Sequence, residues 1–137
     1  MKRPLVVAMA LAVPLTLTIW GCSGSPTQAT AASTVTATFN GTLSQQSTNV
    51  YPFVVSQTGN VTATLTSVGP LATLAIGFGI GSYDSSTSSC ALLTEDDNAR
   101  QGDVLGGAAQ PGSYCVEVFD VGNVQTTATY SVQVTHP

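Results

Sequence analysis

Positive charge is scarce in this 137-residue chain, which has three cationic side chains, Lys2, Arg3 and Arg100, against seven aspartates and glutamates. The first two stand at the N-terminus, in a segment that we expect to be cleaved, which leaves Arg100 alone against all seven acids. Proteins that bind nucleic acid replace the counterions around its phosphates with many lysines and arginines. Nucleic acid is therefore excluded as a partner.

Groups that serve as catalytic bases are equally scarce. Nucleophilic catalysis needs a base beside the nucleophile, and the single histidine, His136, is the penultimate residue, where we expect an exposed tail side chain. Paired carboxylates could run glycoside hydrolysis, with Asp96 and Asp97 or Asp84 and Asp103 as candidates. Adjacent acids at a turn are more often solvated. We therefore predict no catalytic residues and no enzyme, with a weak carboxylate hydrolase as the less favoured alternative.

Long hydrophobic runs are also lacking. The longest, residues 5–20, is interrupted by Pro14 and by threonines and is shorter than the roughly 20 residues that a membrane-spanning helix needs. A basic start, a short apolar core and a small residue at the end are typical of a secretory signal peptide. The residues that follow, Ile-Trp-Gly-Cys at 19–22, resemble the lipobox of bacterial lipoproteins.

The resemblance to bacterial lipoproteins implies that residues 1–21 are the signal peptide and that Cys22 carries the lipid. Trp20 departs from the family pattern, in which a small residue is usual at that place. Two or three acyl chains anchor a protein stably, here to a membrane of the bacterial cell envelope, the outer membrane if the cell is Gram-negative. An uncleaved anchor or an ordinary secreted protein are the alternatives. Residues 22–33 hold neither charge nor large apolar side chains, which predicts a flexible linker.

From residue 34 to residue 137 no apolar residues recur at helical spacing, and they alternate instead with the period of a strand. In the segment 111–120, tyrosine and valine alternate with Cys115, Glu117 and Phe119 on the opposite face. Pro52 pushes its strand toward a sheet edge, and Asn-Gly at 40–41 predicts a turn. The other strand patterns lie at 35–39, 51–55, 61–66, 74–81, 90–93, 104–109 and 130–134. Seven or eight short antiparallel strands predict an all-β sandwich, one domain spanning 34–137.

The order of these segments resembles a bacterial prepeptidase C-terminal (PPC) domain, a β-sandwich related to the collagen-binding modules of secreted peptidases. The resemblance covers about residues 38–135 and rests on the segments 39–43, 51–55 and 74–80, a turn at 96–98, and 112–114 with its strand. It implies a jelly-roll-like sandwich that accompanies extracellular enzymes, often contributes binding and has no catalysis of its own. The chain departs from the family in carrying no peptidase.

Two cysteines remain once Cys22 is assigned to the lipid. In an oxidising compartment an even number of remaining cysteines usually forms disulfides, so we predict a disulfide between Cys90 and Cys115. It would contribute roughly 3 kcal/mol of stability in the chain-entropy model. Two separate thiols are the alternative.

Oxygen ligands for a metal are densest at Glu95, Asp96 and Asp97, and Asp103 and Asp120 could approach them in the fold. Calcium takes about six to eight such oxygens. The spacing is not that of an EF-hand, and no acid precedes the strands, so the linker-borne calcium site of the collagen-binding relatives has no counterpart. Calcium at Glu95, Asp96, Asp97 and Asp103 is the only cofactor considered, and a solvated acidic turn is favoured over it.

Glycine alternates with larger apolar residues at 76–81, so that Gly77, Gly79 and Gly81 share one face of a strand. No helix follows, which excludes a phosphate-binding loop. A bare backbone face permits close approach of a polymer, a partner sheet or a loop of the same domain, the last being favoured. Tyr83 and Phe119 are the aromatic residues expected outside the core, so these five are the candidate binding residues.

These patterns predict a non-catalytic, envelope-anchored interaction module. Its partner would be an extracellular protein or polysaccharide, bound through a sheet face. A structural or chaperone-like accessory of a secreted or membrane complex is the alternative.

Overall fold

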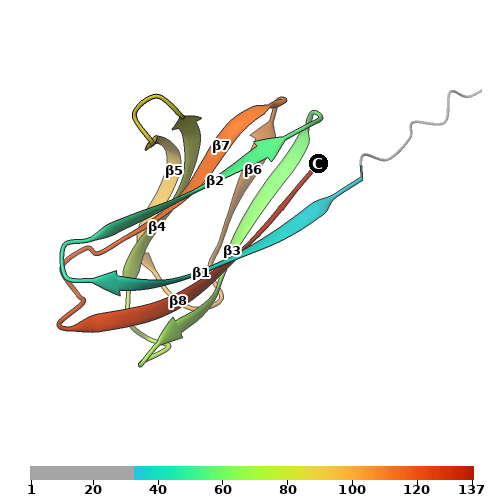
Figure 1. Cartoon of the computed structure of the whole chain (residues 1–137). Helices are drawn as coiled ribbons and strands as arrows, with labels where there is room; N and C mark the ends of the chain where they lie inside the picture. Colours follow the sequence, from blue (N-terminus) through green and yellow to red (C-terminus); the bar gives the residue numbers. More distant parts are fainter. Residues whose placement is uncertain (1–32) are drawn as a thin grey trace, which may run out of the picture. The chain divides into compact units, whose positions relative to one another are not determined.

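Eight strands make up most of the computed structural model, which describes residues 33–137 (Figure 1). The predicted signal peptide, the lipid site Cys22 and all but the last residue of the predicted linker lie outside the described residues. The strands are β1 (Val35–Ser44), β2 (Thr48–Val55), β3 (Gly59–Gly69), β4 (Ile76–Asp84), β5 (Ser89–Ala99), β6 (Val104–Ala109), β7 (Gly112–Phe119) and β8 (Thr127–His136). No helix between residues 33 and 137 has the length and apolar character needed to cross a membrane.

The strands form two four-stranded sheets, in the orders β1-β8-β3-β6 and β2-β7-β4-β5. The first strand pairs with the last, the second with the seventh, the third with the sixth and the fourth with the fifth, always antiparallel. Such nested pairing is that of one long hairpin rolled into two layers, which is a jelly roll. The predicted jelly-roll-like β-sandwich is confirmed, and β2, which contains Pro52, lies at a sheet edge as expected.

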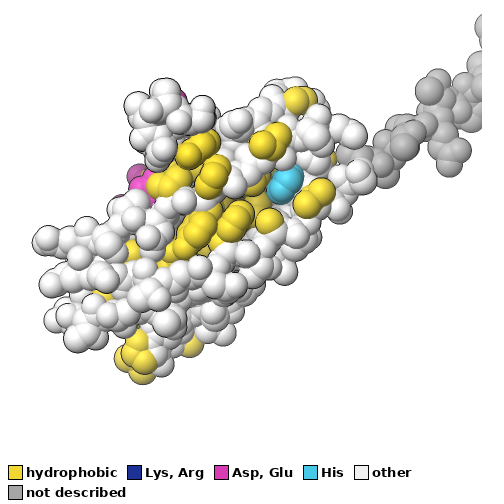
Figure 2. Space-filling view, in the orientation of Figure 1, with side chains coloured by type: hydrophobic (Ala, Val, Ile, Leu, Met, Phe, Trp, Pro, Cys, Tyr) yellow, Lys and Arg dark blue, Asp and Glu magenta, His cyan; other side chains and the backbone are white. Residues whose placement is uncertain are grey.

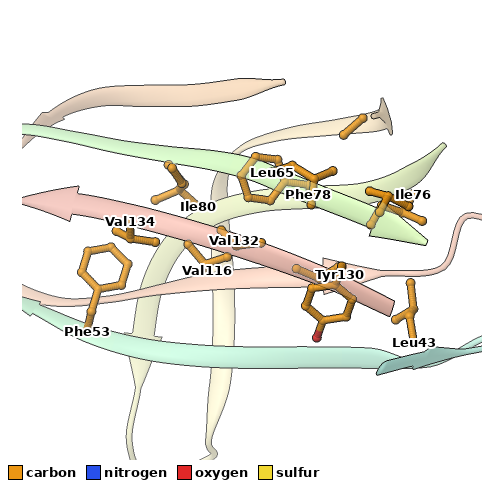
Figure 3. Packing of buried hydrophobic residues seen from close by; sticks show 14 of the residues in the cluster. Leu43, Phe53, Leu65, Ile76, Phe78, Ile80, Val116, Tyr130, Val132 and Val134 are labelled. Atoms are coloured by element: carbon orange, nitrogen blue, oxygen red, sulfur yellow. The ribbon is translucent and has the colours of Figure 1, made fainter. Parts of the chain in front are cut away.

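The core lies between the two sheets and follows the period-two alternation of the sequence. Figure 3 shows Phe78, Val116 and Val132 among the side chains that fill this space, and all three are fully buried. On β7 the opposite face carries Cys115, Glu117 and Phe119, as predicted. Each inward side chain removes apolar surface from water and so stabilises the pairing of the sheets.

Two predicted turns are wrong. Asn40 and Gly41 lie inside β1 and pair with β8. A side chain at Gly41 would collide with the hydroxyl groups of Tyr51 and Tyr130. Packing, and not a turn, accounts for the glycine. Residues 96–98 lie inside β5, and the chain reverses after them, where Gly102 has a φ of 100°. That left-handed conformation favours glycine.

Candidate functional site

The glycine face of β4 is covered by the protein's own chain. A side chain at Gly77 would collide with the ring of Phe119, and one at Gly81 would collide with the carbonyl group of Ala91 on β5. Above Gly79 a Cβ would lie 2.8 Å from the side chain of Leu92. The glycines therefore let neighbouring strands approach closely. Phe119 and β5 occupy this face, so it offers no bare platform to a partner.

The predicted disulfide between Cys90 on β5 and Cys115 on β7 is confirmed, with Cα atoms 5.8 Å apart. Strand β4 lies between these two strands in the sheet, and its Gly81 pairs with Cys115. The bridge therefore joins strands that are not neighbours and ties β5 down over the glycine face. Tyr83, a predicted binding residue, pairs with Cys90 and is half-buried at the end of this hairpin.

The acidic residues proposed for calcium do not gather. Glu95, Asp96 and Asp97 are consecutive on β5, and successive side chains of a strand point to opposite faces. Asp96 accepts a hydrogen bond from the backbone of Asn98 (2.8 Å), and Asp103 accepts one from the backbone of Arg100 (2.8 Å). Within residues 33–137 no three histidines, cysteines, aspartates or glutamates lie close enough to hold a metal ion. A calcium site at these acids, which was the less favoured interpretation, is therefore not formed by the residues that the structure describes.

Two glutamates flank Gly79 on the outer face of their sheet, since Glu95 and Glu117 both pair with it from either side. Partial desolvation, and then the negative charge of Glu95, raise the pKa of Glu117 above its ordinary value. The outer face is thus acidic at its centre.

His136 is buried, contrary to the expected exposed tail residue. It is the last residue of β8 and pairs with Val35, and its ring centroid lies 5.1 Å from that of Phe53. The backbone N–H of Ser56 also donates to the carbonyl group of Pro137 (3.0 Å). The C-terminus is therefore tied into the sheet, and the histidine serves as a packing residue.

An apolar pocket of about 200 Å³ opens at the edge of the sandwich where β5 and β6 face each other. Its lining comes from five strands and includes Val61, Ile80, Leu93, Tyr114 and the β6 segment 106–109. Leu93 is 70% exposed at a register shift of β5. The hydroxyl group of Tyr114 donates to the carbonyl group of Gln110 (3.1 Å), which fixes the ring at the wall.

The pocket was not expected from the sequence, although a signal for it exists. The run Gly-Gly-Ala-Ala at 106–109 places four small residues together on a short strand. Gly107 pairs with the buried Val61 and so faces the gap between the sheets, where a larger residue would fill it. The run therefore marks a place where the edge of the core is left open. Three acids, at 95–97, follow Leu93 on β5, and Asp103 precedes β6. The pocket is thus apolar within and acidic along the strands that frame it.

The class that fold and site define is a jelly-roll β-sandwich with an apolar pocket between two edge strands. Solved structures of similar fold include PliG from Aeromonas hydrophila, a periplasmic inhibitor of g-type lysozyme, at 13% identity and a TM-score of 0.50, over 74% of this chain and 84% of that one. Another is the pre-peptidase C-terminal domain of a Bacillus anthracis collagenase, at 17% identity and a TM-score of 0.49, over 73% of this chain and 87% of that one.

At these identities the likeness concerns the fold. No family model matches the chain, and no curated protein does.

Proposed function

We propose that this protein is a non-catalytic module of the bacterial cell envelope that binds an extracellular protein at the pocket between β5 and β6. The observation that carries the proposal is the apolar pocket itself, about 200 Å³ in volume, left open at the edge of the sandwich and lined by residues of five strands. Concave apolar sites with a few polar groups are where proteins hold ligands, and this one accommodates one or two apolar side chains.

The lining favours a protein partner over a polysaccharide. Sugar rings stack on exposed aromatic faces, whereas this pocket is lined by aliphatic and small residues, with Tyr114 held in its wall by the bond to Gln110. PliG, described as an inhibitor of g-type lysozyme, is a protein of similar fold whose role is to bind another protein. This precedent supports binding without catalysis.

Envelope anchoring is supported by the lipobox-like segment ending at Cys22 and by the disulfide. The bond between Cys90 and Cys115 favours an oxidising compartment, as found outside the bacterial cytoplasm. An acylated Cys22 with a flexible linker would hold the sandwich close to the membrane.

Site-specific photo-crosslinking in the living host tests the proposal. The photoreactive residue benzoylphenylalanine is placed at Gly107, where a Cβ meets nothing within 4 Å, and, as a control, at Val54, which is 63% exposed on β2 and does not line the pocket. We expect a discrete protein adduct from position 107 and none from position 54. No adduct from 107, equal adducts from both, or an adduct digested by glycosidases would overturn it.

A further inference from the structure

We propose that the partner docks by adding an extended, cationic segment to the free edge of β6, with one apolar side chain in the pocket. This inference rests on the proposed function and specifies the chemistry of the partner. The two sheets end in four edge strands, β1 and β6 in one sheet and β2 and β5 in the other. A free edge presents unpaired N–H and C=O groups, and natural proteins protect such edges.

Three of the four edges carry protection. Strand β2 contains Pro52, which has no N–H to offer. The edge of β1 is capped by side chains of β2. Asn49 Nδ2 donates to the carbonyl group of Thr42 (2.9 Å), and the hydroxyl group of Tyr51 donates to the carbonyl group of Asn40 (3.4 Å). Strand β5 has two register shifts and the acids at 95–97. Bulges and charge both discourage strand pairing.

Strand β6 lacks all of these devices. Its six residues, Val-Leu-Gly-Gly-Ala-Ala, include neither proline nor charge, and its pairing with β3 runs without a register shift. None of the side-chain hydrogen bonds formed among residues 33–137 ends on its backbone; the nearest ends on Gln110, just beyond it. This is the edge on which a further strand can pair without displacing a group of the protein.

The direction of the free backbone groups follows from the ladder. The N–H of Leu65 donates to the carbonyl group of Asp103 (2.9 Å), so this carbonyl group points toward β3, and the carbonyl group of Leu65 accepts from the N–H of Gly102 (2.8 Å). Backbone groups that face the partner strand recur at every second residue of an antiparallel ladder, which turns Leu105 and Gly107 toward β3. The N–H and C=O groups of Gly106 and Ala108 therefore lie on the outer edge. They match the spacing at which an added strand forms its bonds.

The pocket and the charges decide what kind of segment fits. Alternate side chains of an added strand point toward the space between the sheets, where the segment 106–109 lines the pocket, so every second position of the partner is apolar. Its other side chains point to solvent from the outer face of the sheet. Residues 33–137 carry seven acids against a single arginine, and the field of this acidic domain favours lysine or arginine at those positions. A second copy of this chain fits poorly, since residues 33–137 hold seven acids and one basic side chain, Arg100.

Peptide probes test the mode directly. A blocked, fluorescent heptapeptide in which lysine alternates with valine is titrated against the full-length protein in non-ionic detergent, beside a matched peptide with glutamate in place of lysine. We expect saturable binding of the lysine peptide, weaker by about tenfold or more for the glutamate peptide. Hydrogen exchange of the amides at 104–109 should slow on binding. Equal binding of both peptides, unchanged exchange there, or dimerisation of the protein through β6 would refute the inference.

A proline variant separates this inference from the proposed function. Ala108→Pro removes an N–H that faces away from β3, a position at which edge strands tolerate proline. The matched control is Thr38→Pro, on the outer edge of β1, which is the capped edge at the other end of the same sheet. We expect Ala108→Pro to weaken the lysine peptide and the crosslink from position 107 by about tenfold, and Thr38→Pro to leave both unchanged. A crosslink from 107 that survives Ala108→Pro in a folded protein leaves the proposed function standing and overturns strand addition; loss of the crosslink in the parent protein overturns both.

Discussion

The hydroxyl groups of Tyr51 and Tyr130, which belong to opposite sheets, lie 2.7 Å apart. Asn49 Nδ2 donates to Tyr130 (2.8 Å), and Tyr51 reaches the carbonyl group of Asn40 (3.4 Å), so one chain of hydrogen bonds links the two sheets at the β1 and β2 edges. Phe39 stacks on Tyr51 with ring centroids 5.0 Å apart. Figure 2 shows hydrophobic side chains along this seam between β2 and β1. This edge of the sandwich is therefore closed.

Tyr130→Phe is expected to lower the free energy of unfolding by about 1–2 kcal/mol, since it removes a buried link between the sheets and leaves Tyr51 with a single weak acceptor. Tyr83→Phe, at a half-buried position, should change it by less than about 0.5 kcal/mol. Urea unfolding followed by circular dichroism measures both. Equal losses in the two variants would show that the chain of hydrogen bonds does not stabilise the fold.

The same tyrosine predicts a loss of stability in alkali. Burial first, and then the hydrogen bond with Tyr51, raise the pKa of Tyr130 well above its ordinary value of about 10. Up to about pH 10 the folded and unfolded states both keep the proton. Above it the unfolded state ionises while the folded state does not, so the free energy of unfolding falls. Unfolding curves between pH 8 and pH 11 should show this slope in the parent and a flatter one in Tyr130→Phe.

The close approach of β5 to β4 predicts a large loss of stability on substitution of Gly81, for which Gly107 on β6 is the control. Gly81→Ala places a Cβ against the backbone of Ala91 and Leu92, which cannot move aside as a side chain can. We expect a loss of about 2–3 kcal/mol, the cost of overpacking. Gly107→Ala meets open space and should stay within about 0.5 kcal/mol of the parent. Thermal unfolding of both variants checks this, and a Gly81→Ala variant as stable as Gly107→Ala would contradict the packing.

Much of the fold follows from local pattern, because a strand buried on one face repeats every two residues. The alternation around Val116, the proline of β2 and the absence of helical spacing are enough to predict a β-sandwich with β2 at an edge. Glycines are harder to interpret. The sequence shows that Gly41 has no side chain, but not whether a turn or an aromatic ring needs the space.

What could not be predicted depends on contacts between distant segments. His136 is near the terminus, where side chains are usually loose, yet pairing with Val35 and packing on Phe53 bury it. The pocket is built by five strands, so no single segment reveals it. The acids at 95–97 suggest a turn by composition, whereas pairing with β4 holds them in a strand.

The disulfide should contribute about 3 kcal/mol to stability, because it closes a loop across 25 positions in the unfolded chain. Replacing Cys90 and Cys115 together by alanine avoids a leftover thiol and measures this contribution by urea unfolding. Reductant should destabilise the parent by a similar amount and leave the double variant unchanged. If reductant leaves the free energy of unfolding of the parent unchanged, the disulfide does not stabilise the protein by restricting the conformations of its unfolded chain.

The lipid anchor is tested by the intact mass of protein extracted from membranes. A chain that begins at acylated Cys22 has lost residues 1–21 and gained the mass of its acyl groups, and reduction then adds about two hydrogens as one disulfide opens. Cys22→Ser should abolish acylation and release the protein from the membrane, since the linker and sandwich carry no other predicted anchor. Trp20→Ala restores the small residue usual in the lipobox and should raise the processed fraction. If the parent has a full-length mass without lipid and Trp20→Ala has the acylated mass, Trp20 is what prevents processing. If both proteins have the full-length mass, the lipoprotein assignment is excluded.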